Sequence, residues 1–431
     1  MADTGKIFGL PTATGRWIFV VLGMLINLCL GSIFSWSVFR KPLENLFQVG
    51  ATESGLPYTI CLTFFAILMP IAGGVLDQYG PRMLAIVGGV IVGLGWIVSS
   101  FAINMTVVSL SYGIVTGSGV GIAYGVPIAV GTKWFPDKKG LAVGLTLVGF
   151  GLSAMITAPL ARYLIDLYGT LYTFRILGLS FLILIVLLAI PLRFPHRQWQ
   201  PQLTGMLKNQ QNQVAIDLTR TQMLQSVPFY GLWLCYIIGT FSGLMAIGIS
   251  SPVGQEIIKL DADTAAIFVS IFAIFNGIGR PLFGWLTDKH TPRFSAIVSF
   301  IIIFLASLGM LTAGESDIWL YALCFSGFWL TLGGWLALAP AATATFFGMK
   351  NYSKKYGVVY TAYGIGAILG TVLSGRLRDI FGSYKYAFIP NAILAIIGIL
   401  IAFWLLKQPE RKPKYRNPKS ETKLLAKNAM G

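Results

Sequence analysis

Apolar residues lie along this chain in long runs that short polar connectors separate. Runs of about 20 residues suit an α-helix that crosses a bilayer, whereas alternating segments of about ten residues would suggest β-strands. The sequence predicts an all-α membrane protein with twelve such helices, at residues 17–39, 56–77, 83–103, 107–131, 140–166, 172–193, 228–250, 264–288, 294–313, 317–340, 356–380 and 385–406.

Composition supports this class of protein. The 431 residues are 55% hydrophobic and 11% charged, whereas soluble domains carry about 25% charged residues. The first apolar run is too long for the core of a cleavable signal peptide, and many others follow it. A net charge of +16 would suggest nucleic acid as the partner of a soluble protein. Here a lipid bilayer is the expected partner and nucleic acid is not, because the positive charge is distributed as a topology signal.

Lysine and arginine are distributed unevenly between the two sides of the predicted membrane. Of the 32 basic residues, 23 fall on the side of the termini and eight on the opposite side. This excess predicts that both termini are cytoplasmic. A polar connector at 194–226 divides the chain into an N-terminal six-helix bundle at 1–193 and a C-terminal one at 227–407. A basic tail at 408–431 follows, for which we expect contact with anionic lipid.

A ten-residue motif joins the second and third spans and recurs between the eighth and ninth. Residues 73–82 and 284–293 share glycine, aspartate, proline and arginine at one offset of 211 residues. A repeat at half the chain length indicates two pseudo-symmetric bundles. The motif resembles the inner-loop signature of the major facilitator superfamily, whose carboxylates and cations latch the bundles together on the cytoplasmic side. By that resemblance the gate residues are Asp77, Arg82, Asp288 and Arg293; helix capping and topology are the alternative roles.

Arg280 lies near the middle of the eighth span. An arginine at this depth costs about 2.5–3.5 kcal/mol on insertion scales, so a functional role is expected. All 16 acidic residues lie in connectors or near helix ends, and no span contains a histidine or, apart from Lys385 at the start of the last span, a lysine. A missing counter-ion suggests an anionic ligand, and the planar guanidinium suits a carboxylate. The alternatives are that Arg280 reaches the membrane surface or pairs with Asp288.

Asn276 lies one turn before Arg280 and shares its helix face. Its amide could bind a carboxylate oxygen or orient the guanidinium. Gly277 and Gly279 make the helix thin beside these two side chains, which suits the approach of a ligand or a neighbour, and equally suits ordinary helix packing.

Aromatic side chains at membrane depth complete the candidate binding site. Tyr124 follows a glycine-rich stretch of the fourth span, and Tyr360 and Tyr363 lie one turn apart in the eleventh. A buried phenol needs a hydrogen-bond partner, and Trp335 adds aromatic surface. Core packing or an interfacial belt is the alternative role for each of them. The glycine-rich stretch lies inside a span with no preceding strand, so it does not predict nucleotide binding.

Nearly the whole chain resembles the oxalate/formate antiporter family of bacterial facilitators, which is related to the animal monocarboxylate transporters. The shared motifs include Ser35-Trp36, the segment Trp134 to Lys138, and Phe275-Asn276-Gly277 with Arg280-Pro281. Asn276 together with Arg280 is most similar to bacterial L-lactate transporters of this family. The resemblance implies that Leu28 and Leu145 pack against the substrate tail, and that Tyr363 replaces the second cation of an oxalate site.

One cation in an apolar wall favours a substrate with one carboxylate and a small tail. We expect a secondary transporter of L-lactate or pyruvate by alternating access, coupled to a proton, monomeric, and located in the bacterial cytoplasmic membrane. Animal relatives place an aspartate where Asn276 stands, so the proton would travel on the substrate or on a gate acid. The alternatives are an oxalate/formate exchanger and a membrane sensor without transport activity. We expect no enzyme activity, cofactor or metal site, since no span holds a pair of acids or metal ligands.

Overall fold

The computed structural model describes residues 6–195, 217–348 and 352–407. Within these ranges, twelve helices are long and apolar enough to cross a membrane, which confirms the predicted number. The predicted basic tail at 408–431 and most of the connector at 194–226 lie outside the described residues.

The first half of the chain contributes six spans, and short segments precede them. A hairpin of β1 (Lys6–Ile7) and β2 (Leu10–Pro11) leads into α1 (Thr12–Gly15). The first span is interrupted by a 3₁₀ turn and the fourth by a π-helical segment. The six spans are α2 (Trp17–Leu30) with η1 (Gly31–Ser35) and α3 (Trp36–Phe47), α4 (Ala51–Tyr79), α5 (Pro81–Ser99), α6 (Met105–Val108) with η2 (Ser109–Thr116) and α7 (Gly117–Trp134), α8 (Lys139–Tyr168), and α9 (Thr170–Ala189).

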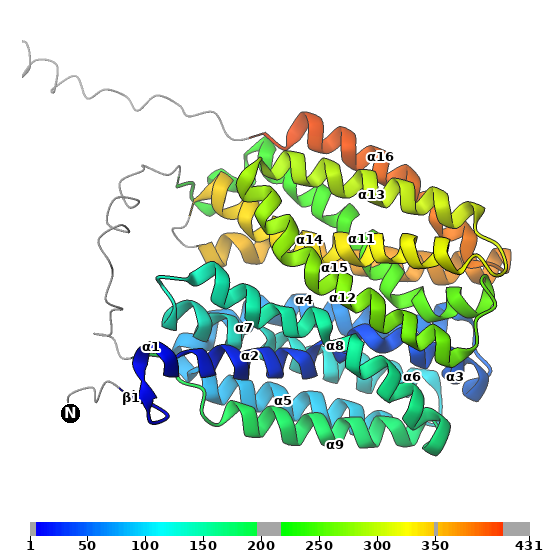
Figure 1. Cartoon of the computed structure of the whole chain (residues 1–431), viewed down its shortest axis with the longest axis horizontal. Helices are drawn as coiled ribbons and strands as arrows, with labels where there is room; N and C mark the ends of the chain where they lie inside the picture. The colour runs from blue at the N-terminus through cyan, green and yellow to red at the C-terminus, as the bar shows by residue number, and fades with distance from the viewer. Residues whose placement is uncertain (1–5, 196–216, 349–351, 408–431) are drawn as a thin grey trace, which may run out of the picture.

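The second half repeats this arrangement after the short helix α10 (Arg220–Leu224). Its six spans are α11 (Val227–Glu256), α12 (Ala262–Lys289), α13 (Pro292–Thr312), α14 (Ile318–Phe347), α15 (Tyr352–Phe381), and η4 (Tyr384–Ala387) with α16 (Phe388–Leu405). Figure 1 shows the two sets of helices side by side, with the described ends of the chain at the same end of the molecule. We call this the terminal end and the opposite one the distal end.

Several helices continue past the apolar runs that predicted them. The first span ends at Phe47, the seventh at Glu256 and the tenth at Phe347, each six or more residues beyond its predicted end. Charged residues such as Arg40 and Glu44 lie in these extensions and are nevertheless buried. Contacts with other helices stabilise them there, so hydropathy alone underestimated the helix lengths.

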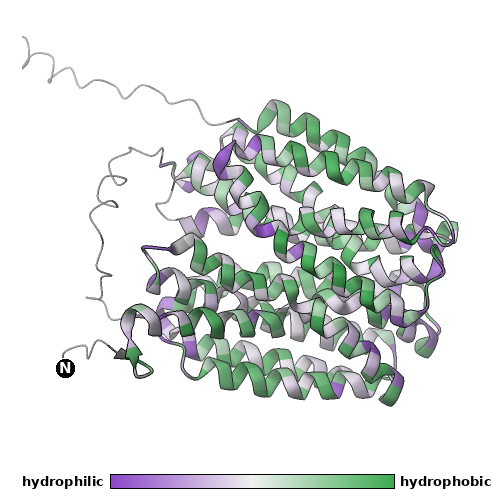
Figure 2. Ribbon diagram, viewed as in Figure 1, coloured by the Kyte–Doolittle hydropathy of each residue, from purple (hydrophilic) through white to green (hydrophobic). Residues whose placement is uncertain are grey.

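Hydropathy divides the surface as a bilayer requires. Hydrophilic residues gather at the ends of the helices and in the connectors, while the long sides are hydrophobic (Figure 2). Large apolar side chains such as Ile67, Leu160 and Leu305 are exposed along those sides. Backbone groups are satisfied within each helix, which is the condition for spanning a membrane.

The two bundles meet mainly through two pairs of helices, α8 against α12 and α4 against α15. Glycine allows the first pair to approach closely, because a Cβ atom at Gly151 would lie 3.0 Å from the Cα atom of Gly277. Arg280 lies on the same helix, one turn further along. The fold therefore places this cation at the interface between the bundles.

Candidate functional site

Arg280 is buried at the bundle interface, with 4% of its surface exposed. Its Nη1 atom donates a 2.7 Å hydrogen bond to the carbonyl oxygen of Leu147 on α8, in the other bundle. Its Cζ atom lies 5.8 Å from the centre of the Phe150 ring. Within the described part of the chain, no carboxylate forms an ion pair with Arg280, and its Nε and Nη2 atoms have no hydrogen-bond partner.

The two unpaired atoms form one edge of the guanidinium. Nε–H and Nη2–H point in parallel, so this edge can hold both oxygens of one carboxylate. A buried cation without a partner is costly. The arrangement therefore fits an anion that arrives from outside the protein.

Asn276 is fully buried, and among the described residues its side chain forms no hydrogen bond with the guanidinium. Its Nδ2 atom donates to the carbonyl oxygen of Trp329 on α14, at 3.2 Å. Its Oδ1 atom has no partner among the described residues. The neighbouring glycines serve helix packing: Gly277 faces Leu152 of α8, and a Cβ atom at Gly279 would lie 2.1 Å from the Leu330 carbonyl oxygen.

Tyr124 lies on the α7 side of the site, within electrostatic range of the Arg280 guanidinium. Its ring centre is 5.0 Å from that of Phe65 and 5.0 Å from that of Phe150. Phe65 is in turn 5.7 Å from Tyr363 and 6.1 Å from Tyr360. The structure thus brings the three predicted tyrosines to one aromatic cluster beside Arg280.

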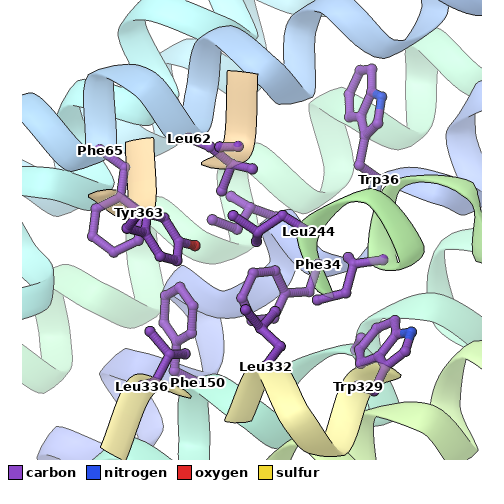
Figure 3. Close-up of a cluster of buried hydrophobic side chains, with 14 of the residues drawn as sticks. Phe34, Trp36, Leu62, Phe65, Phe150, Leu244, Trp329, Leu332, Leu336 and Tyr363 are labelled. Atoms are coloured by element: carbon purple, nitrogen blue, oxygen red, sulfur yellow. The ribbon is translucent and has the colours of Figure 1, made fainter. Parts of the chain in front are cut away.

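An apolar layer separates this cluster from the distal end. Figure 3 shows Tyr363 close to Phe65 and Phe150, with Phe34 and Leu244 next to them. Phe34 of η1 contacts Phe150 edge-on at 5.1 Å and Trp329 at 6.3 Å. Phe34 and Trp329 belong to different bundles, so their contact bridges the interface on the distal side of the site.

For the remaining predicted binding residues, the described structure shows no hydrogen bond or ring contact with Arg280. Leu28 is half-buried on α2, and its carbonyl oxygen accepts a 2.5 Å hydrogen bond from Ser153. Leu145 is 39% exposed, two residues before the Leu147 carbonyl that Arg280 contacts. Trp335 is buried inside the second bundle, where its ring stacks on Tyr236 at 6.0 Å. Trp335 therefore packs α14 against Tyr236 of α11 and Phe300 of α13.

Sequence reasoning missed three residues of the cluster. Phe65, Phe150 and Tyr236 were not among the predicted binding residues. Tyr236 is a phenol at membrane depth like Tyr124, so the same argument could have found it. Nothing in the sequence distinguishes Phe65 from the 28 other phenylalanines.

Among the described residues, the predicted gate residues make no contact that joins the two bundles. Asp77 pairs with Lys133 of its own bundle, and Arg82 and Asp288 are exposed. The Cζ atom of Arg293 lies 4.3 Å from the centre of the Phe403 ring, also within one bundle. Their role as a latch stays a prediction.

Ion pairs between the bundles occur at the distal end instead. Lys41 of α3 pairs with Glu256 of α11, which also accepts from Arg378 at 3.1 Å. Arg162 of α8 pairs with Asp263 of α12 at 2.7 Å. The described residues include no ion pair between the bundles at the terminal end.

Hydrogen bonds to backbone groups reinforce this distal contact. Arg40 is 2% exposed and donates from Nη1 to the carbonyl oxygen of Gly248 at 3.1 Å. The Asp379 carboxylate accepts from the amides of Ala51 and Thr52, both at 2.8 Å. A carboxylate at the first amides of a helix is favourable, so α15 is attached to the start of α4. The structure is closed at the distal end.

Comparison with known proteins agrees with this architecture. The family model described as Major Facilitator Superfamily matches residues 16–340 and 255–430. The chain is 29% identical to the oxalate:formate antiporter of Oxalobacter formigenes, over 96% of each chain. It is 28% identical to monocarboxylate transporter 13 of Bos taurus, over 94% of this chain and 93% of that protein.

A solved structure supports the fold. A bacterial homologue of the human lysosomal transporter Spinster superposes with a TM-score of 0.72 at 16% identity, over 92% of this chain and 98% of that one. These relatives are membrane transporters and not enzymes. The chain belongs to the Major Facilitator Superfamily and is a membrane transporter.

Proposed function

We propose that this transporter carries small monocarboxylates, with L-lactate as the first candidate and pyruvate as its close analogue. The observation that carries the proposal is the free Nε–Nη2 edge of Arg280, buried at the interface with no carboxylate of the described chain beside it. A carboxylate on this edge would supply two charge-assisted hydrogen bonds and neutralise the cation.

The surroundings of Arg280 support a substrate with one charge. The side chains that the structure brings to it are aromatic or aliphatic: Tyr124, Phe150, and beyond them Phe65 and Tyr363. A second carboxylate would meet no second cation in this cluster. An apolar wall instead suits a short hydrocarbon tail.

The same cation suggests how binding and conformational change are linked. An empty site leaves a charge buried at the interface, and closing both bundles around it is costly. A bound carboxylate lowers that cost, so the loaded protein changes between its two open states more readily than the empty one.

We infer that the transport is coupled to a proton that moves with the substrate. The polar groups near Arg280 are phenols and the Asn276 amide, and neither carries a proton readily near neutral pH. The carboxylate of the substrate can, and Asp77 or Asp288 offers a second route at the terminal end. We place the terminal end in the bacterial cytoplasm, on the charge distribution along the chain, and take the monomer as the working unit.

The decisive experiment is uptake of labelled L-lactate into proteoliposomes, with and without an inward proton gradient. Native protein is compared with Arg280→Gln. Gradient-stimulated uptake that the variant loses supports the proposal. Uptake by the variant at the native rate would show that Arg280 does not hold the substrate.

An exchanger is the second candidate, because the 29% identical relative is described as an oxalate:formate antiporter. The same vesicles distinguish it. Lactate uptake that ignores the gradient but requires an anion inside would replace symport by exchange. Exchange of oxalate for formate without any lactate uptake would replace the substrate as well.

A further inference from the structure

Three buried tyrosine hydroxyls lie together, and none has a partner at hydrogen-bond distance among the described residues, although the phenol of Tyr356 lies beside that of Tyr236. They belong to Tyr236 of α11 and to Tyr360 and Tyr363 of α15. Their exposed fractions are 0%, 2% and 1%. Tyr360 and Tyr363 stack with ring centres 5.0 Å apart, and Tyr236 lies 6.4 Å from Tyr360. We call these residues the phenol cluster.

The phenol cluster adjoins Arg280. Tyr124, Tyr236 and Tyr363 all lie within electrostatic range of the guanidinium. Each of these residues is roughly ten residues from the terminal end of its helix, as Arg280 is, which places them at a similar depth of about 15 Å. Tyr236 and Tyr363 are on the same bundle as Arg280, so their relation to it does not depend on movement between the bundles.

A single unpaired hydroxyl would carry no argument. Tyr112 also lacks a partner in the described structure, but it packs between Trp36, Trp96 and Phe174, away from Arg280. By contrast, the hydroxyl of Tyr321 donates to the Ser250 carbonyl oxygen at 2.8 Å. The phenol cluster differs from Tyr112 because several unpaired donors gather beside an unpaired cation.

Buried donors of this kind favour a ligand that brings acceptors. Helix carbonyls are already used by their own helices, so the surrounding backbone offers little. A carboxylate on the Nε–Nη2 edge satisfies Arg280 and leaves the phenols unpaired. An oxygen on the adjacent carbon would accept from a phenol, whether it is a hydroxyl or a keto group.

We propose that the phenol cluster, through Tyr236, recognises the oxygen on carbon 2 of the substrate. This inference rests on the proposed function and makes it more specific, since it selects 2-hydroxy and 2-keto monocarboxylates over plain fatty acids. Tyr236 is then a specificity-determining residue, while Arg280 binds the charge that all these acids share.

The test compares Tyr236→Phe with the native protein in proton-driven uptake of L-lactate, pyruvate and propionate. Propionate has the size and charge of lactate but no oxygen on carbon 2. Loss of one neutral hydrogen bond lowers kcat/KM for lactate and pyruvate about 2- to 12-fold, while that for propionate stays within about twofold. Tyr112→Phe, which removes an unpaired hydroxyl outside the site, is the matched control and changes none of the three.

Two results would overturn the inference. An equal fall for all three acids would mean that Tyr236 only supports packing, which a lower melting temperature of the variant would accompany. Unchanged selectivity in a well-folded variant would exclude the hydroxyl from recognition. If the native protein moved none of these acids, the proposed function itself would fail, so the two failures are distinguishable.

Discussion

Replacing Arg280 by lysine tests the geometry of the site separately from its charge. Arginine offers the carboxylate two parallel donors, Nε–H and Nη2–H, both unpaired in the described structure. Lysine offers a compact point charge in their place. A hydrogen bond to a charged group contributes about 1.5–3 kcal/mol, so losing one of the two lowers kcat/KM about 10- to 150-fold. Glutamine removes the charge as well, and uptake should fall about 100-fold or more.

The assay is initial-rate uptake of labelled L-lactate in proteoliposomes at equal protein density. Arg175→Lys is the matched control. Arg175 stacks on Phe101 and Tyr172 far from the bundle interface, so its exchange for lysine should leave uptake unchanged. A value of kcat/KM for Arg280→Lys within threefold of native would refute two-point binding and leave only an electrostatic role.

Three further variants test the interface and the terminal end. Gly151→Val forces a branched side chain against the backbone of α12, where even a Cβ atom would lie 3.0 Å from the Cα atom of Gly277. An overpacking cost of about 1–3 kcal/mol predicts a maximum uptake rate about 5- to 150-fold lower, with the fold retained. An unchanged rate would show that α8 and α12 need not approach this closely. Asp263→Asn breaks a largely exposed pair with Arg162. Such pairs contribute about 0.2–1 kcal/mol. Spin labels at the distal ends of α4 and α12 should therefore report at most about a fivefold larger population that is open at the distal end. A complete shift to that open state would show that the Arg162–Asp263 pair is stronger than proposed. Arg16 donates two hydrogen bonds to Asp137, at 2.6 and 2.7 Å, which hold the pKa of Asp137 below its ordinary 3.8. Asp137→Asn removes the charge and one of the two acceptors, so thermal unfolding in detergent should show a loss of about 1–2 kcal/mol that is present above pH 3.8 and disappears as the pH falls below it. A loss independent of pH would exclude this ion pair as the cause.

The fold could be predicted from the sequence because hydropathy determines it almost alone. A run of about 20 apolar residues has few stable alternatives to a spanning helix. The failures were at helix ends such as Glu256 and Phe347, where the chain leaves the apolar core. There, contacts between helices decide where the helix stops, and a single-chain pattern does not contain them.

The site could be predicted only in part. Arg280 stood out because a charge inside a span is rare, and the structure does leave it without a carboxylate among the residues it describes. Phe65 and Tyr236 did not stand out, because aromatic residues are common in all spans. Their importance comes from packing against Tyr124 and Tyr360, which are distant in sequence. Such contacts follow from how the bundles fold, and periodicity along one helix does not report them.

The distal contacts explain why a transporter can hold this state without being trapped in it. Both states of an alternating-access cycle must lie within a few kcal/mol of each other, or the rarer one is never visited. At the distal end, the pair between Arg162 and Asp263 is partly exposed and therefore weak. At the terminal end, the pair between Lys133 and Asp77 is also weak, because 81% of the Asp77 side chain is exposed. Breaking the Arg162–Asp263 pair and freeing Asp77 for a partner in the other bundle each cost little. The unpaired cation at Arg280 is an expensive feature between the described parts of the two bundles. A carboxylate that reaches it from either side removes that cost, so its binding decides whether the bundles move.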